Sequence, residues 1–225
     1  MTEITLTLNG SQVSGRQGMT ILELATENGI DIPTLCYIPE LSPSGVCRIC
    51  VVEVEGSRTL VASCHTPIAQ GMVILTHSAK VLETRKVVLE LLLASHAGFC
   101  VVCDKANLCQ LRNIMTDLEI GLPGFQTRKR YYPIEDISPY VERDLSKCIL
   151  CRKCIRVCSE IAKQDVYSTS YRGFDSKVVV DCDQPLDREV CRDCGICIPV
   201  CPTGALSKSR KMSQEKNGKS LVVSG

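Results

Sequence analysis

Cysteine is the residue of this sequence with the greatest capacity for chemistry, and its copies lie in groups. The chain of 225 residues has 16 cysteines, and all except Cys182 fall into four groups with short spacing. The opening residues, MTEITLTLNG, lack the charged-then-apolar layout of a signal peptide, so we expect a cytoplasmic protein. Because the cytosol keeps disulfides reduced, clustered thiols in such a chain favour metal binding over a secreted disulfide scaffold.

Two fourfold groups near the C-terminal end repeat one another with the spacing C-x2-C-x2-C-x3-C. Bacterial ferredoxins use this run for two [4Fe–4S] clusters: three thiolates on a tight loop bind one cluster, and the fourth binds the other. We assign one cluster to Cys148, Cys151, Cys154 and Cys201. We assign the second cluster to Cys191, Cys194, Cys197 and Cys158. Zinc sites are the alternative, although they prefer two separated C-x2-C knuckles.

The two runs differ in the residue that follows the last cysteine. Pro202 follows the second run, as in the motif, whereas Ser159 follows the first. We expect this departure to affect the local turn more than the ligand.

An N-terminal group has the spacing Cys36-x10-Cys47-x2-Cys50-x13-Cys64. Plant-type ferredoxins hold a [2Fe–2S] cluster with C-x4-C-x2-C and a distant fourth cysteine, so the central pair is retained here and the first gap is longer. Residues 41–45 can loop out within that gap, and we predict a [2Fe–2S] cluster. The spacing alone leaves zinc open, and the strand–helix–strand order around the group disfavours it.

A third group, His96-x3-Cys100-x2-Cys103-x5-Cys109, has one cysteine too few for a [4Fe–4S] cluster. A neutral imidazole can take the fourth position, and its missing negative charge should raise the reduction potential. The residues alone leave a second interpretation open, in which His96 only ends the preceding helix, where a cation is favourable. We interpret the other histidines of the chain as ordinary surface or turn residues: His65 and His77.

Five basic residues adjoin the cubane motifs: Lys147, Arg152, Lys153, Arg156 and Arg192. Their charge either favours the more negative, reduced clusters or faces solvent or a partner. Cys182 lies near the end of the apolar run 178–180, where we expect a buried structural thiol.

The elements that must position these groups indicate the α+β class. Residues 4–8 alternate apolar and polar side chains before Asn9-Gly10, which predicts a strand and a hairpin turn. Thr20 with Glu23 forms a capping box that starts a helix. Further strands are expected at 51–54, 59–62 and 72–76, and further helices at 78–95 and 106–120, before the break Gly121-Leu122-Pro123-Gly124. The predicted domains are 1–78, 79–124 and 139–207, with a connector at 125–138 and a flexible tail at 208–225.

Composition disfavours several classes of function. The formal net charge is +1, so no basic face for nucleic acid is indicated. The most apolar stretch, 87–94, contains Glu90 and falls short of the roughly 20 apolar residues of a membrane span. Neither G-x-G-x-x-G nor G-x-x-x-x-G-K-[ST] occurs, so we expect no nucleotide site on this chain.

Together with the three kinds of cysteine group, the segments PTLC (33–36), CRICVVEV (47–54) and KCILC (147–151) resemble a known family over about residues 1–207. They are similar to the N-terminal part of the large iron–sulfur subunit of respiratory complex I and of iron-only hydrogenases. In length the chain is most similar to the small diaphorase, or gamma-type, iron–sulfur subunit of NAD(P)-linked hydrogenases. The resemblance implies a plant-type ferredoxin (β-grasp) domain, a helical domain whose cluster is held by one histidine and three cysteines, with His96 as that histidine, and a bacterial double-[4Fe–4S] ferredoxin domain.

The resemblance also implies a relay with one [2Fe–2S] and three [4Fe–4S] clusters and no substrate site on this chain. Electrons would enter from a flavin- and NAD(P)-binding iron–sulfur subunit and leave to a hydrogenase subunit of the nickel–iron type. The alternative is the same relay in a formate dehydrogenase, an electron-bifurcating complex or a complex I-like oxidoreductase. A zinc-held scaffold without redox work and a free-standing polyferredoxin are the other hypotheses.

Overall fold

The computed structural model describes residues 3–97, 100–121, 123–136, 138, 140–186, 191–192 and 194–209. The chain divides into two compact units, each formed by two segments of the sequence. The first unit combines Met1–Ala94 with Leu111–Thr127, and the second combines Ser95–Gln110 with Arg128–Gly225. The expected domain 79–124 is therefore shared: most of its helical residues group with the first unit and its cysteine-bearing loop with the second. The finer five-part division stays a prediction.

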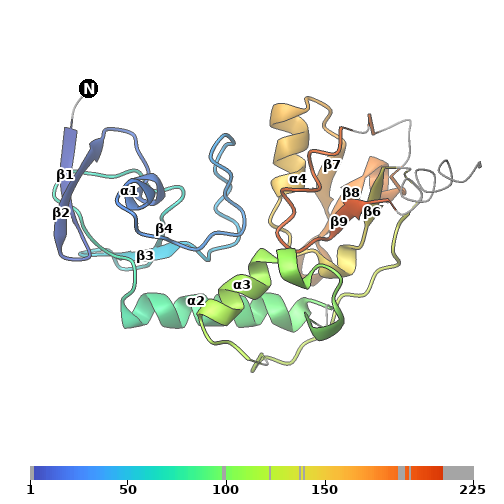
Figure 1. Cartoon of the computed structure of the whole chain (residues 1–225), viewed down its shortest axis with the longest axis horizontal. Helices are drawn as coiled ribbons and strands as arrows, with labels where there is room; N and C mark the ends of the chain where they lie inside the picture. The colour runs from blue at the N-terminus through green and yellow to red at the C-terminus, as the bar shows by residue number, and fades with distance from the viewer. Residues whose placement is uncertain are drawn as a thin grey trace, which may run out of the picture. The chain divides into compact units, whose positions relative to one another are not determined.

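The first unit is built on a five-stranded sheet of order β2-β1-β5-β3-β4 (Figure 1). Its strands are β1 (Glu3–Leu8), β2 (Ser11–Arg16), β3 (Val51–Val54), β4 (Val61–Ala62) and β5 (Val73–Leu75). The hairpin expected between β1 and β2 is confirmed, because Asn9 and Gly10 adopt the left-handed φ values of 50° and 86° that its two-residue turn requires. β4 and β5 are shorter than expected.

Helix α1 (Ile21–Glu27) begins at the capping box that the sequence predicts. The Thr20 hydroxyl accepts a hydrogen bond from the Glu23 backbone N–H at 3.2 Å, and the Glu23 carboxylate accepts one from the Thr20 N–H at 2.7 Å. The helix buries four residues in the core of the unit: Ile21, Leu22, Leu24 and Ala25. This packing anchors the start of the loop that carries the first cysteine group.

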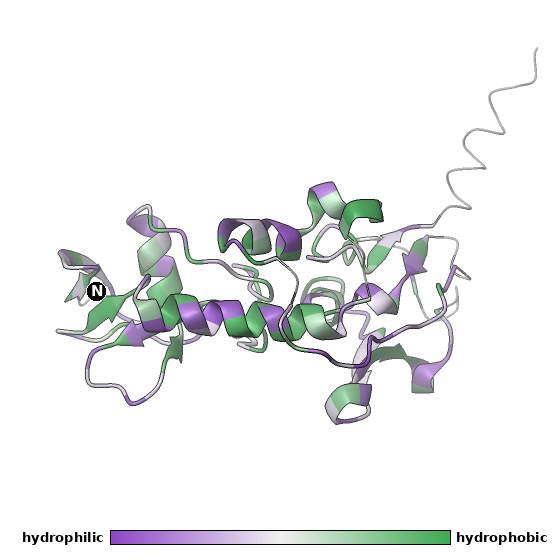
Figure 2. Cartoon of the chain, turned by 90° about the horizontal axis from the view of Figure 1, so that it is seen from below, coloured by the Kyte–Doolittle hydropathy of each residue, from purple (hydrophilic) through white to green (hydrophobic). Residues whose placement is uncertain are grey.

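Helices α2 (Ala79–Ser95) and α3 (Gln110–Asp117) lie mainly in the first unit. Figure 2 shows hydrophilic and hydrophobic bands alternating along α2, as expected for a helix with one buried face. The buried residues of α2 are Val81, Arg85, Leu89, Leu93 and Ala94. Among the described residues, no helix is long and apolar enough to cross a membrane.

The second unit contains two antiparallel pairs of short strands. β6 (Val141–Arg143) pairs with β9 (Leu206–Lys208), and β7 (Tyr167–Ser170) pairs with β8 (Lys177–Val180). Helix α4 (Lys153–Arg156) continues into the π-helical turn η4 (Val157–Ile161), which contains the Ser159 that replaces proline of the motif. The 3-10 helices of this unit are η1 (Cys100–Val102), η2 (Ala106–Leu108), η3 (Leu145–Lys147), η5 (Gly173–Asp175) and η6 (Asp181–Asp183).

Two expected boundaries need correction. The helix expected at 106–120 begins at Gln110, because Cys109 is extended, with φ −85° and ψ 107°. The first two residues of the expected tail are ordered, because Lys208 ends β9 and Ser209 is buried, with its N–H donating to the Tyr140 carbonyl at 3.0 Å. Residues 210–225 of that tail, and Leu122 of the expected break, lie outside the described residues.

Candidate metal centres

The first cysteine group gathers at one end of β3 and β4. Cys47 and Cys50 lie in the loop that enters β3, and Cys64 follows β4. The antiparallel pairing of these strands places Ser63 opposite Cys50, and the Ser63 N–H and hydroxyl donate to the Cys50 carbonyl at 3.1 and 2.8 Å. The sulfur atoms of Cys50 and Cys64 are consequently only 3.4 Å apart.

The four thiols of this group are all buried and act on one another. Hydrogen bonds from Cys47 and Cys64 lower the pKa of Cys36 far below its ordinary value. The hydrogen-bond contact with the Cys64 sulfur lowers the pKa of Cys50 to about 6. Cys47 and Cys64 have raised pKa values, through these same sulfur contacts and then through burial. The group is thus one connected set of sulfur atoms, two of which favour the thiolate form that binds iron.

A cavity in the second unit brings together cysteines from both fourfold runs. It is lined by four thiols, those of Cys148, Cys151, Cys154 and Cys201. Three of these come from the first run and one from the second, which is the set that the ferredoxin motif assigns to one cluster. Leu150 and Arg152 have φ values of 57° and 60°, so the loop bends through the left-handed region between successive cysteines.

Burial dominates the acidity of the thiols in this cavity. It raises the pKa of Cys151 to about 12 and also raises the pKa values of Cys148 and Cys154. A buried thiolate is costly unless a positive charge compensates it. Iron supplies such a charge, and metal coordination deprotonates a thiol. The donor set therefore fits a cationic iron–sulfur cluster.

The other fourfold set also lies in the second unit. Burial, followed by the charges of Cys191, Cys194 and Cys158, raises the pKa of Cys197 to about 11. The last cysteine of the first run, Cys158, therefore interacts with Cys194 and Cys197 of the second. The Tyr167 hydroxyl lies 3.7 Å from the Cys197 sulfur, within hydrogen-bonding range for sulfur. Three of the four thiols are buried, and Cys194 is exposed.

The histidine of the third group has the features of a metal ligand. His96 is 7% exposed, and its Nδ1 has no hydrogen-bond partner among the described residues. Burial and then the charges of Lys129 and Arg130 lower the pKa of His96 to about 4. The ring is therefore neutral at pH 7, which is the form that binds metal and not the cation that would stabilise a helix end.

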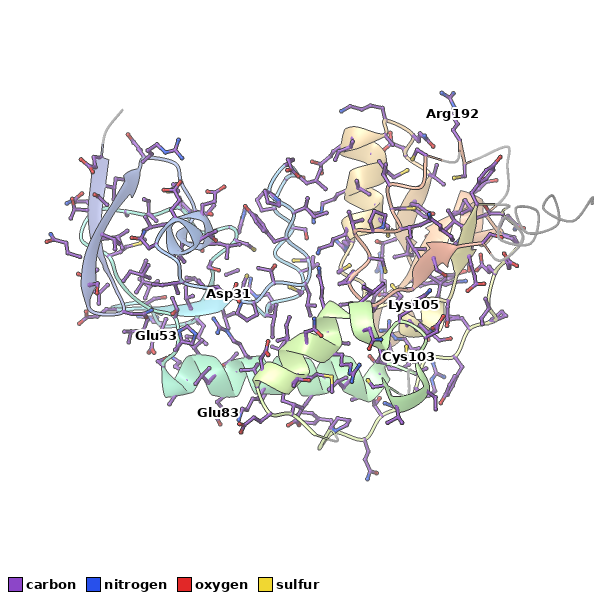
Figure 3. All side chains as sticks on the ribbon, viewed as in Figure 1. Asp31, Glu53, Glu83, Cys103, Lys105 and Arg192 are labelled. Carbon is purple, nitrogen blue, oxygen red and sulfur yellow. The ribbon has the colours of Figure 1, made fainter. Side chains whose placement is uncertain are left out.

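The cysteines of the third group lie on and beside two short turns: Cys100 begins η1, Cys103 follows η1, and Cys109 follows η2. Cys109 is buried, and Cys100 and Cys103 are half-buried. Figure 3 shows Cys103 and Lys105 close together on this segment of the second unit. The Ala97 N–H donates to the Ser146 carbonyl at 3.2 Å, so the loop is held beside the start of the first fourfold run.

Two of the five basic residues connect cluster-bearing segments. Lys147 Nζ lies 3.1 Å from carboxylate oxygens of both Asp104 and Asp144. Lys153 is buried, and its Nζ donates to Gln110 Oε1 at 3.3 Å. Their charges are therefore engaged within the protein and do not face open solvent.

The other three basic residues have different surroundings. Arg156 is buried, whereas Arg152 lines the first cubane cavity from an exposed position. Arg192 is also exposed, and its side chain extends outward in Figure 3. Of these three, Arg192 best matches the interpretation that the charge faces solvent or a partner.

The expectation for Cys182 is wrong, because its side chain is exposed. The residue follows β8 within η6 and adopts φ 55°, so the chain leaves the strand in a left-handed turn before the thiol can join the core. His65 and His77 are exposed, as predicted.

Two residues at the clusters were not identified from the sequence. Arg143 and Tyr167 line the cavity with the four cysteines, yet neither lies inside a cysteine run. The only local signal for Arg143 is its position shortly before Cys148. Its burial comes from strand pairing that the spacing of cysteines does not reveal.

Three family models match the chain in consecutive segments. The 2Fe-2S iron-sulfur cluster binding domain matches residues 1–79, and the NADH-ubiquinone oxidoreductase-G iron-sulfur binding region matches residues 85–121. The ferredoxin-like domain of NADH-quinone oxidoreductase subunit 3 matches residues 138–207. These matches confirm the predicted α+β class and the presence of both [2Fe–2S] and [4Fe–4S] binding domains.

Several curated proteins are similar to the chain. The NADP-reducing hydrogenase subunit HndD of Solidesulfovibrio fructosivorans is 41% identical over 92% of this chain and 36% of its own length. An NADH-quinone oxidoreductase subunit of Rhizobium meliloti is 36% identical over 90% of this chain and 24% of its own length. The NADPH-Fe(3+) oxidoreductase subunit alpha of Geobacter sulfurreducens is 34% identical over 90% of this chain and 24% of its own length. The chain thus spans about a quarter to a third of these relatives.

Among solved structures, a chain of NAD+-reducing [NiFe]-hydrogenase in the H2-reduced state has the same fold. The TM-score is 0.81 at 29% identity, and the match covers 92% of this chain and 88% of that chain. The order of the three domain matches agrees with the order of the cysteine groups. The chain is therefore an iron–sulfur protein related to the subunits of NAD(P)-linked hydrogenases and of NADH-quinone oxidoreductase.

Proposed function

We propose that the chain is an electron-transfer subunit with one [2Fe–2S] cluster, three [4Fe–4S] clusters and no substrate site of its own. The observation that carries the proposal is the cavity lined by Cys148, Cys151, Cys154 and Cys201. Two independent metal sites would each use their own run, whereas a shared site is the arrangement of paired cubanes.

The proposed ligands follow the four groups. The [2Fe–2S] cluster takes Cys36, Cys47, Cys50 and Cys64. The three [4Fe–4S] clusters take the sets His96, Cys100, Cys103 and Cys109; Cys148, Cys151, Cys154 and Cys201; and Cys158, Cys191, Cys194 and Cys197. When bound, these clusters supply one-electron transfer. The chain contributes the sulfur and nitrogen donors, keeps most of them out of water, and links the third group to the first run through the Ala97–Ser146 hydrogen bond.

We place this relay between a flavin- and NAD(P)-binding iron–sulfur subunit and a hydrogenase subunit of the nickel–iron type. The names of two similar proteins, an NADP-reducing hydrogenase subunit and an NAD+-reducing [NiFe]-hydrogenase, support this placement. The second candidate is the same relay in another oxidoreductase. It is supported by the likeness to the NADH-quinone oxidoreductase of Rhizobium meliloti and to the NADPH-Fe(3+) oxidoreductase. Purification of the native complex separates the two: a nickel-binding partner favours the first, and a molybdenum- or tungsten-binding partner favours the second.

A zinc-held scaffold is the hypothesis of another class. Among the described residues, no three His, Cys, Asp or Glu side chains are placed to hold a single ion. Four thiolates of a structural zinc site all bind one ion at about 2.3 Å, whereas the ligands of an iron–sulfur cluster are distributed over several irons. The match of residues 1–79 to a 2Fe-2S binding domain also supports iron.

Metal and sulfide analysis of anaerobically purified protein tests the proposal. We expect about 14 iron per chain, a similar amount of acid-labile sulfide and almost no zinc. About 10 iron would mean that one cubane is missing, and the group with His96 would be the first suspect. Several zinc without sulfide would refute the electron-relay function.

A further inference from the structure

Arg143 is the largest fully buried side chain among the described residues of the second unit. It is 1% exposed, although it carries a permanent positive charge. Burial of a charge is costly unless a partner compensates for the lost water. The surroundings of Arg143 therefore indicate what this charge is for.

The protein satisfies the guanidinium only in part. Its Nη2 donates to the Val178 carbonyl at 3.0 Å, and its Nη1 lies 3.2 Å from the Glu135 carboxylate. The guanidinium also lies 5.8 Å from the centre of the Tyr167 ring. Yet Nε and Nη1 have no hydrogen-bond partner among the described residues, and both are buried. Donors are therefore left over on a side chain that has no access to water.

The same side chain lines the cavity of Cys148, Cys151, Cys154 and Cys201. Arg130 also lies near Cys148, and its guanidinium donates to the Cys148 carbonyl at 3.1 Å. Arg152 also lines the cavity, but its side chain is exposed, so water screens its charge. Among the arginines that line this cavity, only Arg143 is buried.

We propose that Arg143 is the buried counter-charge of this cluster site and raises the midpoint potential of the [4Fe–4S] cluster bound there. The inference rests on the proposed function. Reduction adds one electron and no proton, so the cluster gains one negative charge, and a fixed positive charge in a water-poor cavity stabilises the reduced state. Glu135 partly offsets Arg143 and therefore lowers that potential.

The test is a redox titration of the full chain with all clusters, using dithionite as reductant and electron paramagnetic resonance as the readout. Arg143→Met should shift one cubane to lower potential and leave the [2Fe–2S] centre unchanged as an internal reference. Arg143→Lys, which keeps the charge, should recover part of the shift. Glu135→Gln should shift the same cubane in the opposite direction, and Arg152→Gln should give a smaller shift than Arg143→Met.

Unchanged potentials in both Arg143→Met and Glu135→Gln, with full iron content, would overturn the counter-charge while leaving the relay intact. Absence of iron and sulfide from the unmodified chain would instead overturn the relay. If Arg143→Met does not fold, the potential measured in Glu135→Gln tests the counter-charge instead. This variant should fold, because the Glu135 side chain is 21% exposed and the change is isosteric. A potential that stays the same or falls in Glu135→Gln contradicts the inference.

Discussion

The backbone N–H of Gln110 donates a 2.8 Å hydrogen bond to the carbonyl of Pro202. These residues directly follow Cys109 and Cys201, so one peptide contact joins the histidine-containing group to a proposed ligand of the first cubane site. The side-chain oxygen of Gln110 also accepts from Lys153, in helix α4, which carries Cys154 of the first run. The loop of the third cluster is therefore docked on the double-cubane part of its own unit by contacts that adjoin the cysteines.

The ion pair between Lys147 and Asp104 should hold the same loop. Their side chains are 19% and 53% exposed, so the pair contributes at most about 1 kcal/mol. We predict that Lys147→Met speeds hydrogen exchange of the amides at 103–109 up to roughly fivefold, because Asp104 then keeps only Lys105, on its own loop, as an ion-pair partner. Lys80→Met, at an exposed position of α2, is the control and should leave these amides unchanged. Equal exchange in the Lys147→Met variant and the unmodified chain would show that the ion pair does not hold the loop.

The Lys105 side chain of the loop packs closely against the backbone at Gly204. A Cβ built on Gly204 would lie 2.8 Å from the Cβ of Lys105, and the residue adopts φ +66°. Gly204→Ala should therefore lower the free energy of unfolding by about 2–4 kcal/mol, through left-handed strain and through displacement of Lys105. Urea unfolding, followed by the loss of cluster absorbance, measures the change.

Gly173→Ala is the matched control for this prediction. Gly173 has a similar φ of +59°, but nothing lies within 4 Å of its built Cβ. The free energy of unfolding of Gly173→Ala should therefore fall only by the contribution of left-handed strain, about 1–2 kcal/mol. Equal losses in the two variants would mean that the contact with Lys105 is unimportant.

Local signals in the sequence predicted the elements of the first unit well. Asn9-Gly10 requires left-handed backbone, and Thr20 with Glu23 satisfies helix N–H groups within four residues, so both features are encoded by neighbours in the chain. The cysteines could be grouped from their spacing, because an iron–sulfur cluster constrains the spacing of its ligands, and which cysteines bind which cluster stays a prediction.

Features that depend on distant partners were not predictable in the same way. Arg143 is buried because β6 pairs with β9 and with the bridge at Glu135, which are contacts between separate parts of the chain. The start of α3 depends on Pro202, some ninety positions from Gln110. Cys182 follows an apolar run, yet a left-handed turn directly after the strand exposes it.

The backbone at Arg152 should favour glycine over alanine. Arg152 is exposed but has φ 60°, a region in which a Cβ is unfavourable. We predict that Arg152→Gly is more stable to urea than Arg152→Ala by about 1 kcal/mol, because both lose the same side-chain contacts and only alanine keeps the strain. A more stable alanine variant would contradict the left-handed conformation of this loop.

The crossed assignment of the fourfold runs makes the sharpest prediction about the clusters. Cys201→Ser should impair the cubane bound by the first run, and Cys158→Ser the cubane bound by the second, because each run lends its fourth thiolate to the other. Each variant should lose up to about 4 iron, and the two should lose different signals in electron paramagnetic resonance. Cys182→Ser, which removes the exposed thiol outside every group, is the control and should keep all the iron. If Cys201→Ser and Arg143→Met alter different cubanes, Cys201 does not belong to the cavity that Arg143 lines.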